Sequence, residues 1–589
     1  MSKVNVLSPD VIAKIAAGEA VERPASVVKE LLENAIDAGA TSIEIHLKDA
    51  GKELVHVKDN GSGIGREDLE KIFQRHATSK ISTIENLQEL ASLGFRGEAL
   101  YSIAAVSDVV VTSRTKDEEG WQIHVRAGMR QNLEPASVGT TGTDIKIGEL
   151  FFNTPARRKF LKNNASEMHH ILNAVLPYTL IYPQKRFLLT HAGRSFLDLR
   201  PAPGPLDRVA AALNVRMDHL LECDQEFVQE DIRIRMILGD INIQRPSRNL
   251  QFMAINDRPV ESKNLSFNLN DVYRLILPPG VYGAFIVNIT LNAANVDVNI
   301  HPTKREVRLK DEARIISLLR RMAEYQLMQK GGTKLMSFPR TESGHPSHAA
   351  QMYSPPAAGA AQEGGLPAGQ IIFGPGEWQS KFNPTALQEA PLEFQLFGRE
   401  NNLRSKFAGA RYVGSFLQKF LVFEADVSLM IVDQHAAQER IMFEKFKNQI
   451  ESAQVETQPL LTPLLLKLTP QEKLAWEELQ EKLSCAGIET TQFDDDTIAV
   501  QTQPLLLKNI ESAVRSLLAG GQTPRMDPDT LARRACKASI VAGDKLDASQ
   551  ADYQRRQLLE CKDPFTCPHG RPTLIEITQD FLDRQFLRT

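Results

Sequence analysis

The stretch that decides the fold is Val27-Val-Lys-Glu-Leu-Leu-Glu-Asn-Ala-Ile-Asp-Ala-Gly-Ala40, close to the N-terminus. Its apolar residues fall on two neighbouring helical stripes, whereas Glu30, Asn34 and Asp37 recur on a different face. The pattern predicts an amphipathic helix. We expect one face of this helix to pack against a core and the other to present polar groups.

Signals at both ends agree with this helix. Ser26 can cap its start, and Gly39 can end it in a left-handed turn. Glu30 lies one turn before Asn34, a spacing that suits a nucleotide hydrolase, because the carboxylate can polarise a water and the carboxamide can offer a neutral oxygen to Mg²⁺. An isolated pair of this kind is more often part of a solvated face, so the interpretation depends on the rest of the chain.

Length and composition limit the class of protein. The 589 residues are too many for one core and predict roughly three or four domains. No run reaches the ~20 apolar residues of a membrane span, and the first residues lack a signal-peptide pattern, so we expect a cytoplasmic protein with no membrane partner. The formal charge of −4 argues against a protein coated in base, so any contact with nucleic acid should come from local, salt-sensitive patches.

Two alternating segments follow the helix, Ile43 to Leu47 and Val55 to Val57, and they predict antiparallel strands joined by a tight turn. The second strand runs into Asp59-Asn-Gly-Ser-Gly-Ile-Gly65. Gly61 and Gly63 let the backbone approach a flat ligand, and the carboxylate at the strand end can accept the exocyclic amine of adenine. A lone D-x-G-x-G is also common in ordinary turns.

A polar segment, Arg75-His-Ala-Thr-Ser-Lys80, precedes Leu93-Gly-Phe-Arg-Gly-Glu-Ala-Leu100. Glycines that open a helix leave free N–H groups, which suit phosphates. The residues between these two segments are numerous and polar enough to form a lid over a nucleotide. In the later turn Gly139-Thr-Thr-Gly-Thr143, the hydroxyl of Thr143 can help to hold the base.

Taken in order, these pieces resemble the four ATP-binding motifs of the GHKL ATPases, a group that includes type II topoisomerases, heat-shock chaperones and histidine kinases. The matching motifs are Glu30/Asn34, Asp59-x-Gly-x-Gly63, Gly94-Phe-Arg-Gly97 and Gly142-Thr143. Within the group the chain resembles the MutL mismatch-repair proteins over essentially its full length apart from a middle linker. This closer resemblance lies in residues 15–26, 75–80, 94–100 and 150–159.

The resemblance implies an N-terminal α/β sandwich that binds ATP with Mg²⁺. In it Glu30 would activate water, Asn34 would hold Mg²⁺, and Asp59 would select adenine. The other nucleotide contacts that the resemblance implies are Asp37, Gly61, Gly63, Thr78, Ser79, Lys80, Gly94, Phe95, Arg96, Gly97, Glu98 and Thr143.

The next region alternates strands and helices and predicts a second α/β domain, with strands at residues 232–238, 251–255 and 282–291. It ends in an exposed basic turn that contains Lys304, which by itself indicates only a solvent-facing lysine. The resemblance implies a ribosomal-protein-like transducer domain in which Lys304 reaches the γ-phosphate. Such a lysine would couple the nucleotide state to the angle between the domains.

Composition changes in the middle of the chain, where Pro, Gly, Ala, Ser and Gln predict a flexible tether. Within it, Phe394-Gln-Leu-Phe397 is either a docking peptide or the start of the next domain. The predicted class is therefore a multidomain α+β and α/β protein. Its predicted parts are an ATPase domain (1–204), a transducer domain (205–331), a linker (332–405) and a C-terminal α/β dimerisation and metal-binding domain (406–589).

The C-terminal part contains a candidate metal motif. We predict a strand that ends at Asp433 and a helix that begins near Ala436, which places His435 and Glu439 one turn apart at the junction. An imidazole and a carboxylate at this spacing can bind one metal, and Asp433 can join them. A capping aspartate and a surface glutamate would give the same pattern.

Three of the five cysteines, Cys536, Cys561 and Cys567, lie late in the chain and indicate a thiolate site. Cys536 is placed on an amphipathic helix, and Cys567-Pro-His-Gly-Arg-Pro572 on a rigid turn that also carries His569. Cysteine, histidine and carboxylate together favour Zn²⁺ or a related ion, and the ligands are numerous enough for two adjacent ions. Alternatively, Cys536 is a core thiol or the site is purely structural.

The same segments resemble the signature of nicking MutL proteins: Asp433-Gln-His-Ala-x-x-Glu-x-x-x-x-Glu444, residues 535–537, residues 567–572 and Phe586-Leu-Arg588, with Lys537 and Leu587 as departures at variable positions. This resemblance implies a metal-dependent endonuclease that uses Zn²⁺ and/or Mn²⁺. The implied ligands are Asp433, His435, Glu439, Cys536, Cys567 and His569, with Asp433 and Glu439 catalytic. The nearest alternative is a MutL that only relays the mismatch signal and binds a structural zinc. A chaperone or topoisomerase-like clamp is disfavoured because no topoisomerase tyrosine with its acidic cluster is evident.

The implied partners are a second copy of the chain, a MutS–DNA complex and double-stranded DNA. Arg157, Arg158 and Lys159 are candidate contacts to the DNA backbone, although a solvated basic turn has the same composition. Gln458-Pro-Leu-Leu461 resembles a sliding-clamp docking peptide, and Gln503-Pro-Leu-Leu506 matches it equally well.

Overall fold

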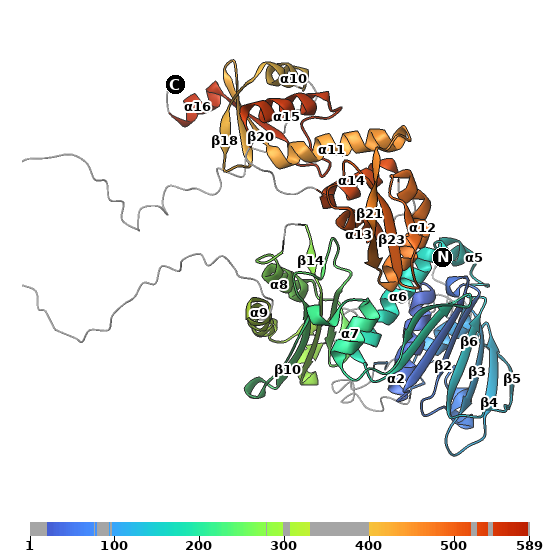
Figure 1. Cartoon of the computed structure of the whole chain (residues 1–589). Helices are drawn as coiled ribbons and strands as arrows, with labels where there is room; N and C mark the ends of the chain where they lie inside the picture. The colour runs from blue at the N-terminus through green and yellow to red at the C-terminus, as the bar shows by residue number, and fades with distance from the viewer. Residues whose placement is uncertain are drawn as a thin grey trace, which may run out of the picture. The chain divides into compact units, whose positions relative to one another are not determined.

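A computed structural model describes residues 21–75, 77–78, 93–94, 97–277, 280–297, 307–329, 400–519, 527–539 and 546–586. The chain divides into two compact units (Figure 1). One unit comprises residues 1–335, 435–543 and 561–572, and the other residues 336–434, 544–560 and 573–589. No helix in the described ranges is long and apolar enough to cross a membrane.

The predicted first helix is α2, Pro24–Asp37, and its apolar stripes are buried while Glu30, Asn34 and Asp37 are half-buried. The helix begins earlier than predicted because Pro24 occupies its first turn, where the fixed φ of proline suits a helix start. Capping by Ser26 is therefore wrong, since Arg23 occupies the N-cap position and makes no side-chain cap. Gly39 has φ +73° and ends the helix in the left-handed region, as predicted.

The predicted ATPase region is built on an eight-stranded sheet of order β5-β4-β3-β6-β2-β1-β7-β8. Strands β1 and β2 are antiparallel, as predicted, with Ile45 opposite Val57. Helices α2 and α6 pack on each other and cover one face of the sheet (Figure 1). The strands are β1 Ser42–Lys48, β2 Leu54–Asp59, β3 Asp108–Arg114, β4 Trp121–Arg126, β5 Met129–Pro135, β6 Gly142–Gly148, β7 Arg186–His191 and β8 Arg194–Leu199, and the helices after α2 are α3 Arg66–Lys71, α4 Ala99–Ala105, α5 Pro155–Phe160 and α6 Asn164–Ile181. The predicted sandwich is confirmed.

The second α/β region has a five-stranded sheet of order β13-β12-β15-β10-β9. Its elements are α7 Pro205–Leu213, β9 Leu220–Phe227, β10 Ile232–Gly239, β11 Gln244–Arg245, β12 Gln251–Ile255, β13 Arg258–Val260, α8 Lys263–Tyr273, β14 Tyr282–Gly283, β15 Phe285–Leu291, β16 Val296–Asp297, β17 Arg308–Leu309 and α9 Glu312–Gln329. The predicted strand at 282–291 is divided between β14 and β15. Gly283 lies directly against the Tyr273 ring, where a Cβ would come within 2.2 Å of Cε1. Strand β14 pairs with β11, whereas β15 pairs with β10 and β12.

The first compact unit resumes at His435, within helix α11. This helix spans Gln434–Glu451 and starts two residues before the predicted Ala436. A three-stranded antiparallel sheet of order β21-β23-β22 follows. The elements are β21 Thr457–Lys467, α12 Pro470–Cys485, β22 Thr490–Gln492, β23 Thr497–Pro504, α13 Ile510–Leu518 and α14 Pro528–Ser539. Their core includes Phe446, Trp476 and Leu517.

The second unit is a four-stranded antiparallel sheet of order β18-β19-β20-β24 with three helices. The elements are α10 Glu400–Gly409, β18 Arg411–Phe416, β19 Phe420–Ala425, β20 Ser428–Asp433, α15 Ala548–Glu560, β24 Leu574–Thr578 and α16 Gln579–Gln585. Helix α10 overlaps the end of the predicted linker, because Phe407 is buried edge-to-face against Phe423 with ring centroids 5.4 Å apart. Residues 394–397 lie outside the described ranges.

Candidate functional site

The polar face of α2 faces the glycine-rich segments of the ATPase region. The Asp37 carboxylate accepts hydrogen bonds from the backbone N–H groups of Leu93 (2.9 Å) and Gly94 (3.1 Å). The Glu30 side chain is 26% exposed, and its Oε1 lies 3.6 Å from Lys29 Nζ. The last turn of α2 thus holds the start of the predicted phosphate-binding segment, while Glu30 stays accessible to water.

Asp59 ends β2 opposite Thr143 of β6. Its Oδ1 accepts a hydrogen bond of 2.8 Å from the Gly61 N–H. Burial raises the pKa of Asp59 to about 6, although the N–H groups of Gly61 and Thr143 act in the opposite direction. The carboxylate is therefore mostly ionised at neutral pH, the state that accepts a hydrogen bond from an amine.

Glycines around Asp59 allow segments of backbone to approach one another. At Gly63, with φ +73°, a Cβ would lie 2.0 Å from the Arg114 carbonyl oxygen. At Gly142, with φ +137°, it would lie 2.1 Å from the Asp59 carbonyl oxygen. The sequence suggested that glycines here make room for a ligand; Gly63 and Gly142 are required first by contacts within the protein.

Ser113 of β3 is a residue that the sequence analysis missed. It is buried, its Oγ accepts a 2.8 Å hydrogen bond from the Ile64 N–H, and its hydroxyl lies 2.9 Å from the Gly142 carbonyl oxygen and 3.0 Å from Thr143 Oγ1. Ser113 therefore connects the loop after Asp59 to the strand that carries Thr143. The available signal was its position, since it follows Val109 and Val111 on the buried face of β3.

The two segments that flank the predicted lid approach each other at Gly97, which has φ +63° and where a Cβ would lie 2.5 Å from the Ala77 carbonyl oxygen. Glu98 lies 3.7 Å from Arg75 across the same junction. Helix α4 begins immediately afterwards, as predicted. Thr78 is described next to Ala77, whereas Ser79, Lys80, Phe95, Arg96 and Lys304 lie outside the described residues.

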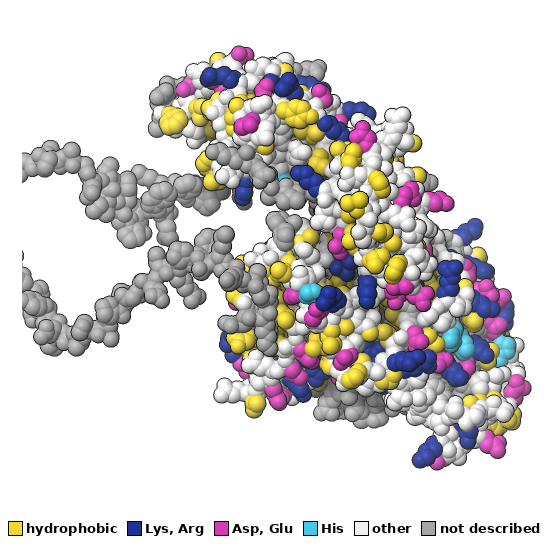
Figure 2. Space-filling model, in the orientation of Figure 1, with side chains coloured by type: hydrophobic (Ala, Val, Ile, Leu, Met, Phe, Trp, Pro, Cys, Tyr) yellow, Lys and Arg dark blue, Asp and Glu magenta, His cyan; other side chains and the backbone are white. Residues whose placement is uncertain are grey.

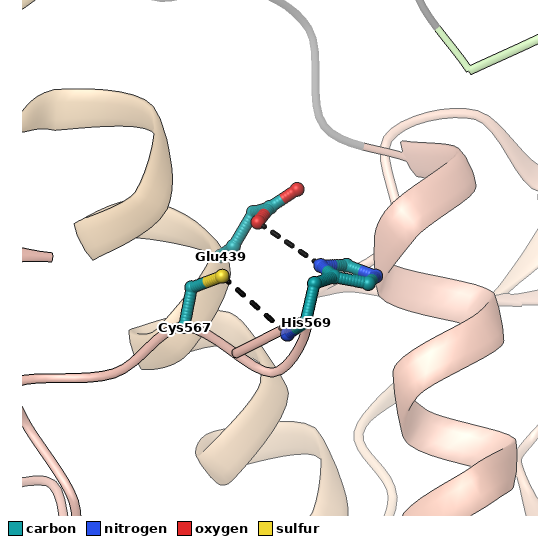
Figure 3. A group of neighbouring side chains, drawn as sticks. All are labelled: Glu439, Cys567 and His569. Atoms are coloured by element: carbon teal, nitrogen blue, oxygen red, sulfur yellow. Dashed lines mark hydrogen bonds and ion pairs between the residues drawn. The ribbon is translucent and has the colours of Figure 1, made fainter. Parts of the chain in front are cut away.

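In the C-terminal part, Glu439, Cys567 and His569 form the group of potential metal ligands found among the described residues (Figure 3). One ligand atom from each lies within 4.8 Å of the others. His569 Nδ1 is 3.3 Å from Glu439 Oε2, and the His569 N–H donates to Cys567 Sγ at 3.4 Å (Figure 3). Oxygen, nitrogen and sulfur donors in one place fit Zn²⁺ or a related transition ion better than Mg²⁺.

A tight turn presents Cys567 and His569 together. The Cys567 N–H donates to the Arg571 carbonyl at 2.7 Å, and the Gly570 N–H donates to the Cys567 carbonyl at 2.9 Å. Gly570 adopts φ +83°, and Thr566 pairs with Pro572 across the base of the turn. The predicted rigid turn is confirmed.

The other predicted ligands lie outside this three-residue group. His435 Nε2 lies 3.4 Å from Glu439 Oε1. Asp433 ends β20, and its N–H donates to the Thr573 carbonyl at 2.9 Å. Cys536 is buried in the apolar core, where burial first and the charge of Glu439 second raise its pKa to about 12, so the core-thiol alternative for Cys536 stays open.

Arg440 and Glu444 of α11 hold the segment that leads to Cys567. The buried Arg440 donates from Nε to the Thr566 carbonyl, and its Nη2 lies 3.3 Å from Asp563. Glu444 accepts from the N–H groups of Lys562 (2.7 Å) and Asp563 (3.3 Å). Glu444 belongs to a motif that is visible in the sequence. The sequence does not show that Arg440 and Glu444 together hold the loop of Cys567 and His569 against α11.

The predicted surface motifs lie on exposed elements. Residues 458–461 are part of β21, where Leu461 is fully exposed and Gln458 lies opposite Gln503 of β23. Residues 157–159 belong to the short helix α5. Basic and acidic side chains are interspersed over the visible face of the molecule, in agreement with the near-neutral charge (Figure 2).

The N-terminal fold and its pocket define an ATPase of the GHKL type. Residues 22–143 match the family model described as "Histidine kinase-, DNA gyrase B-, and HSP90-like ATPase". Residues 211–327 match "DNA mismatch repair protein, C-terminal domain", and residues 413–546 match "MutL C terminal dimerisation domain".

Full-length relatives identify the particular family. DNA mismatch repair proteins MutL from Exiguobacterium sp. and Elusimicrobium minutum are 32% and 33% identical, and each alignment spans 100% of both chains. The Aquifex aeolicus MutL ATPase domain complexed with ADP is 29% identical and aligns with 51% of this chain and 97% of that one, with a TM-score of 0.38. The chain belongs to the MutL family of DNA mismatch repair proteins, with an ATPase domain and a C-terminal dimerisation domain.

Proposed function

We propose that this chain is an ATP-dependent dimeric clamp that couples mismatch recognition by MutS to strand removal, and that its C-terminal part nicks DNA. The observation that supports nicking is the convergence of Glu439, Cys567 and His569 from a helix and a distant loop. Three groups of suitable chemistry within 4.8 Å of one another are more than a solvated surface requires.

In the ATPase domain, Glu30 acts as the base for attack of water on the γ-phosphate, Asn34 binds Mg²⁺, and Asp59 recognises adenine. The accessible Glu30 carboxylate and the mostly ionised Asp59 support these roles. We expect turnover to be slow if the lid closes only when two N-terminal domains meet. Lys304 is proposed to contact the γ-phosphate.

In the C-terminal part, Glu439, Cys567 and His569 hold the ion, and Asp433 and His435, which precede Glu439 closely in the sequence, are proposed to join them. A bound Zn²⁺ or Mn²⁺ supplies Lewis acidity for phosphodiester hydrolysis. Asp433 and Glu439 are the carboxylates proposed to act in the reaction.

A plasmid assay tests the nuclease. With Mn²⁺ the wild type should convert supercoiled plasmid to the nicked circle, and Asp433→Asn should not. ATP hydrolysis by the same preparations serves as the control, because Asp433 has no part in the ATPase site. Equal nicking by both proteins would refute the endonuclease proposal.

A MutL that relays the mismatch signal with a structural metal is the second candidate. The burial of Cys567 favours it, because the ligands of a structural site leave no coordination position open to water or substrate. It predicts a tightly held ion with no nicking under any metal. Co-purification with a MutS homologue on mismatched DNA is expected for both candidates and would be absent for an unrelated ATP-driven clamp.

Binding of the sliding clamp is proposed at residues 458–461, which lie on an exposed strand. Gln458→Ala should weaken clamp binding measured by surface plasmon resonance. Gln503→Ala is the matched control, because the Gln503 side chain is engaged by a hydrogen bond to the Leu507 carbonyl. If only Gln503→Ala weakens binding, the assignment is wrong.

A further inference from the structure

A buried charged cluster lies beside Glu30 on α2. Glu33 is on the core side of the helix, and its Oε1 lies 2.9 Å from Lys29 Nζ. The same oxygen accepts a hydrogen bond from the Tyr178 hydroxyl of α6. Lys29 Nζ is also 3.6 Å from Oε1 of Glu30. One ammonium group therefore lies between a buried carboxylate and the proposed catalytic carboxylate.

The two distances show which carboxylate holds the lysine. A separation of 2.9 Å is a charge-assisted hydrogen bond, whereas 3.6 Å is too long for one. Glu33 is almost completely buried, and its Oε2 has no hydrogen-bond partner, so loss of Lys29 would leave a buried carboxylate without its counter-charge. Lys29 is therefore hydrogen-bonded to Glu33, and its ion pair with Glu30 is held at the longer distance.

Tyr178 completes the cluster from α6. Its side chain is buried, and burial together with the charge of Glu33 raises its pKa well above the usual range, so the phenol remains a neutral donor. Replacing such a buried polar cluster with apolar side chains of similar volume is often neutral for stability. Stability alone is therefore a weak reason for these three residue types.

We propose that Glu33 and Tyr178 are positioning residues that retain Lys29, so that the Glu30 carboxylate receives no direct hydrogen bond from Lys29 and can accept a proton from the attacking water. The inference rests on the proposed role of Glu30 as the base. The cluster is expected to affect the rate of ATP turnover and not the affinity for nucleotide, because Lys29, Glu33 and Tyr178 are not among the predicted nucleotide contacts.

The test uses steady-state ATP hydrolysis by the full-length protein. Glu33→Gln removes the charge that retains Lys29, so the lysine can pair with Glu30, and kcat should fall about tenfold while KM stays within about twofold. In the double variant Lys29→Met with Glu33→Gln, no ammonium remains to pair with Glu30. Its kcat should return to within about twofold of the wild type.

Tyr178→Phe should lower kcat more modestly, by about twofold to fivefold, because it removes one of the two groups that bind Glu33. Tyr273→Phe is the matched control, since that buried hydroxyl also donates to protein oxygens but lies on α8. Its turnover should match the wild type.

The result that would overturn the inference is an unchanged kcat in Glu33→Gln, or a double variant as slow as Glu33→Gln alone. The second outcome would mean that the single change acts by disturbing the fold. Glu30→Ala, measured in parallel, separates the two levels of the proposal. If Glu30→Ala is inactive and Glu33→Gln is normal, only the inference fails; if Glu30→Ala is active, the proposed base is wrong.

Discussion

The nucleotide pocket and the metal group are assembled in different ways. The predicted nucleotide site lies at the ends of β2, β3 and β6 and on the polar face of α2, and its described contacts include backbone N–H groups and close approaches at glycines. The metal group consists of three side chains from α11 and a loop, joined by Arg440 and Glu444. The nucleotide site should therefore keep its structure when a single side chain is removed. The metal group should lose its structure after such a change.

The largest expected effect distinguishes the catalytic role of Glu30 from the structure of the nucleotide site. Glu30→Ala should lower ATP turnover by about 10²-fold or more, the usual contribution of a general base, while ATP binding persists because the backbone contacts remain. Turnover and equilibrium binding of a labelled nucleotide should be measured on one preparation. Loss of binding in parallel with turnover would contradict this view of the pocket.

The corresponding change beside the metal group is Arg440→Met, which removes the contacts to Thr566 and Asp563 while leaving every ligand in place. We expect metal affinity to fall by about 10- to 100-fold, as is typical when supporting contacts around ligands are lost. Competition with a chromophoric chelator measures it. Lys445→Met on the same helix is the control, and equal affinities for both variants would show that the loop needs no fastening.

Glycines provide a third comparison between the sites. Gly63→Ala places a Cβ 2.0 Å from a backbone oxygen, whereas a Cβ at Gly570 meets nothing within 4 Å. Gly570→Ala should therefore cost only the left-handed backbone strain of about 1–2 kcal/mol, and Gly63→Ala considerably more. Thermal denaturation should show the larger decrease in Tm for Gly63→Ala. The opposite order would mean that the loop after Asp59 can move aside at little cost.

The smallest expected change in binding is a pH dependence of nucleotide affinity. Because the pKa of Asp59 is about 6, nucleotide affinity should fall by up to tenfold per pH unit below pH 6, and Asp59→Asn should bind more weakly without this dependence. A raised carboxyl pKa also means that the unliganded protein loses stability as pH rises through about 6, by up to ~3 kcal/mol from this group. Asp59→Asn should remove that loss. A wild-type affinity that is flat between pH 5 and pH 8 would contradict the role of Asp59.

Much of the pocket was predictable because its signals are local. The spacing of Glu30, Asn34 and Asp37, the alternation in β1 and β2, and the glycines after Asp59 are all periodic or contiguous features. The start of α2 was misjudged because Pro24 outweighs Ser26 as a helix-start signal.

The parts that could not be predicted depend on contacts between distant segments. Ser113 acts through Ile64 and Gly142, and Arg440 acts through the loop before Cys567. Neither partner can be read from the neighbouring sequence. The division of the strand at 282–291 likewise follows the pairing with other strands, since β14 pairs with β11 and β15 with β10 and β12.

The measurement that most directly tests the central claim is nicking of supercoiled plasmid across a Mn²⁺ titration, with the wild type and Cys567→Ser compared side by side and ATP hydrolysis measured on both. The claim is that a metal held by Glu439, Cys567 and His569 cuts DNA while a separate pocket hydrolyses ATP. It predicts nicked circles for the wild type only, with equal ATP turnover. Equal nicking by the two proteins at every metal concentration would contradict it.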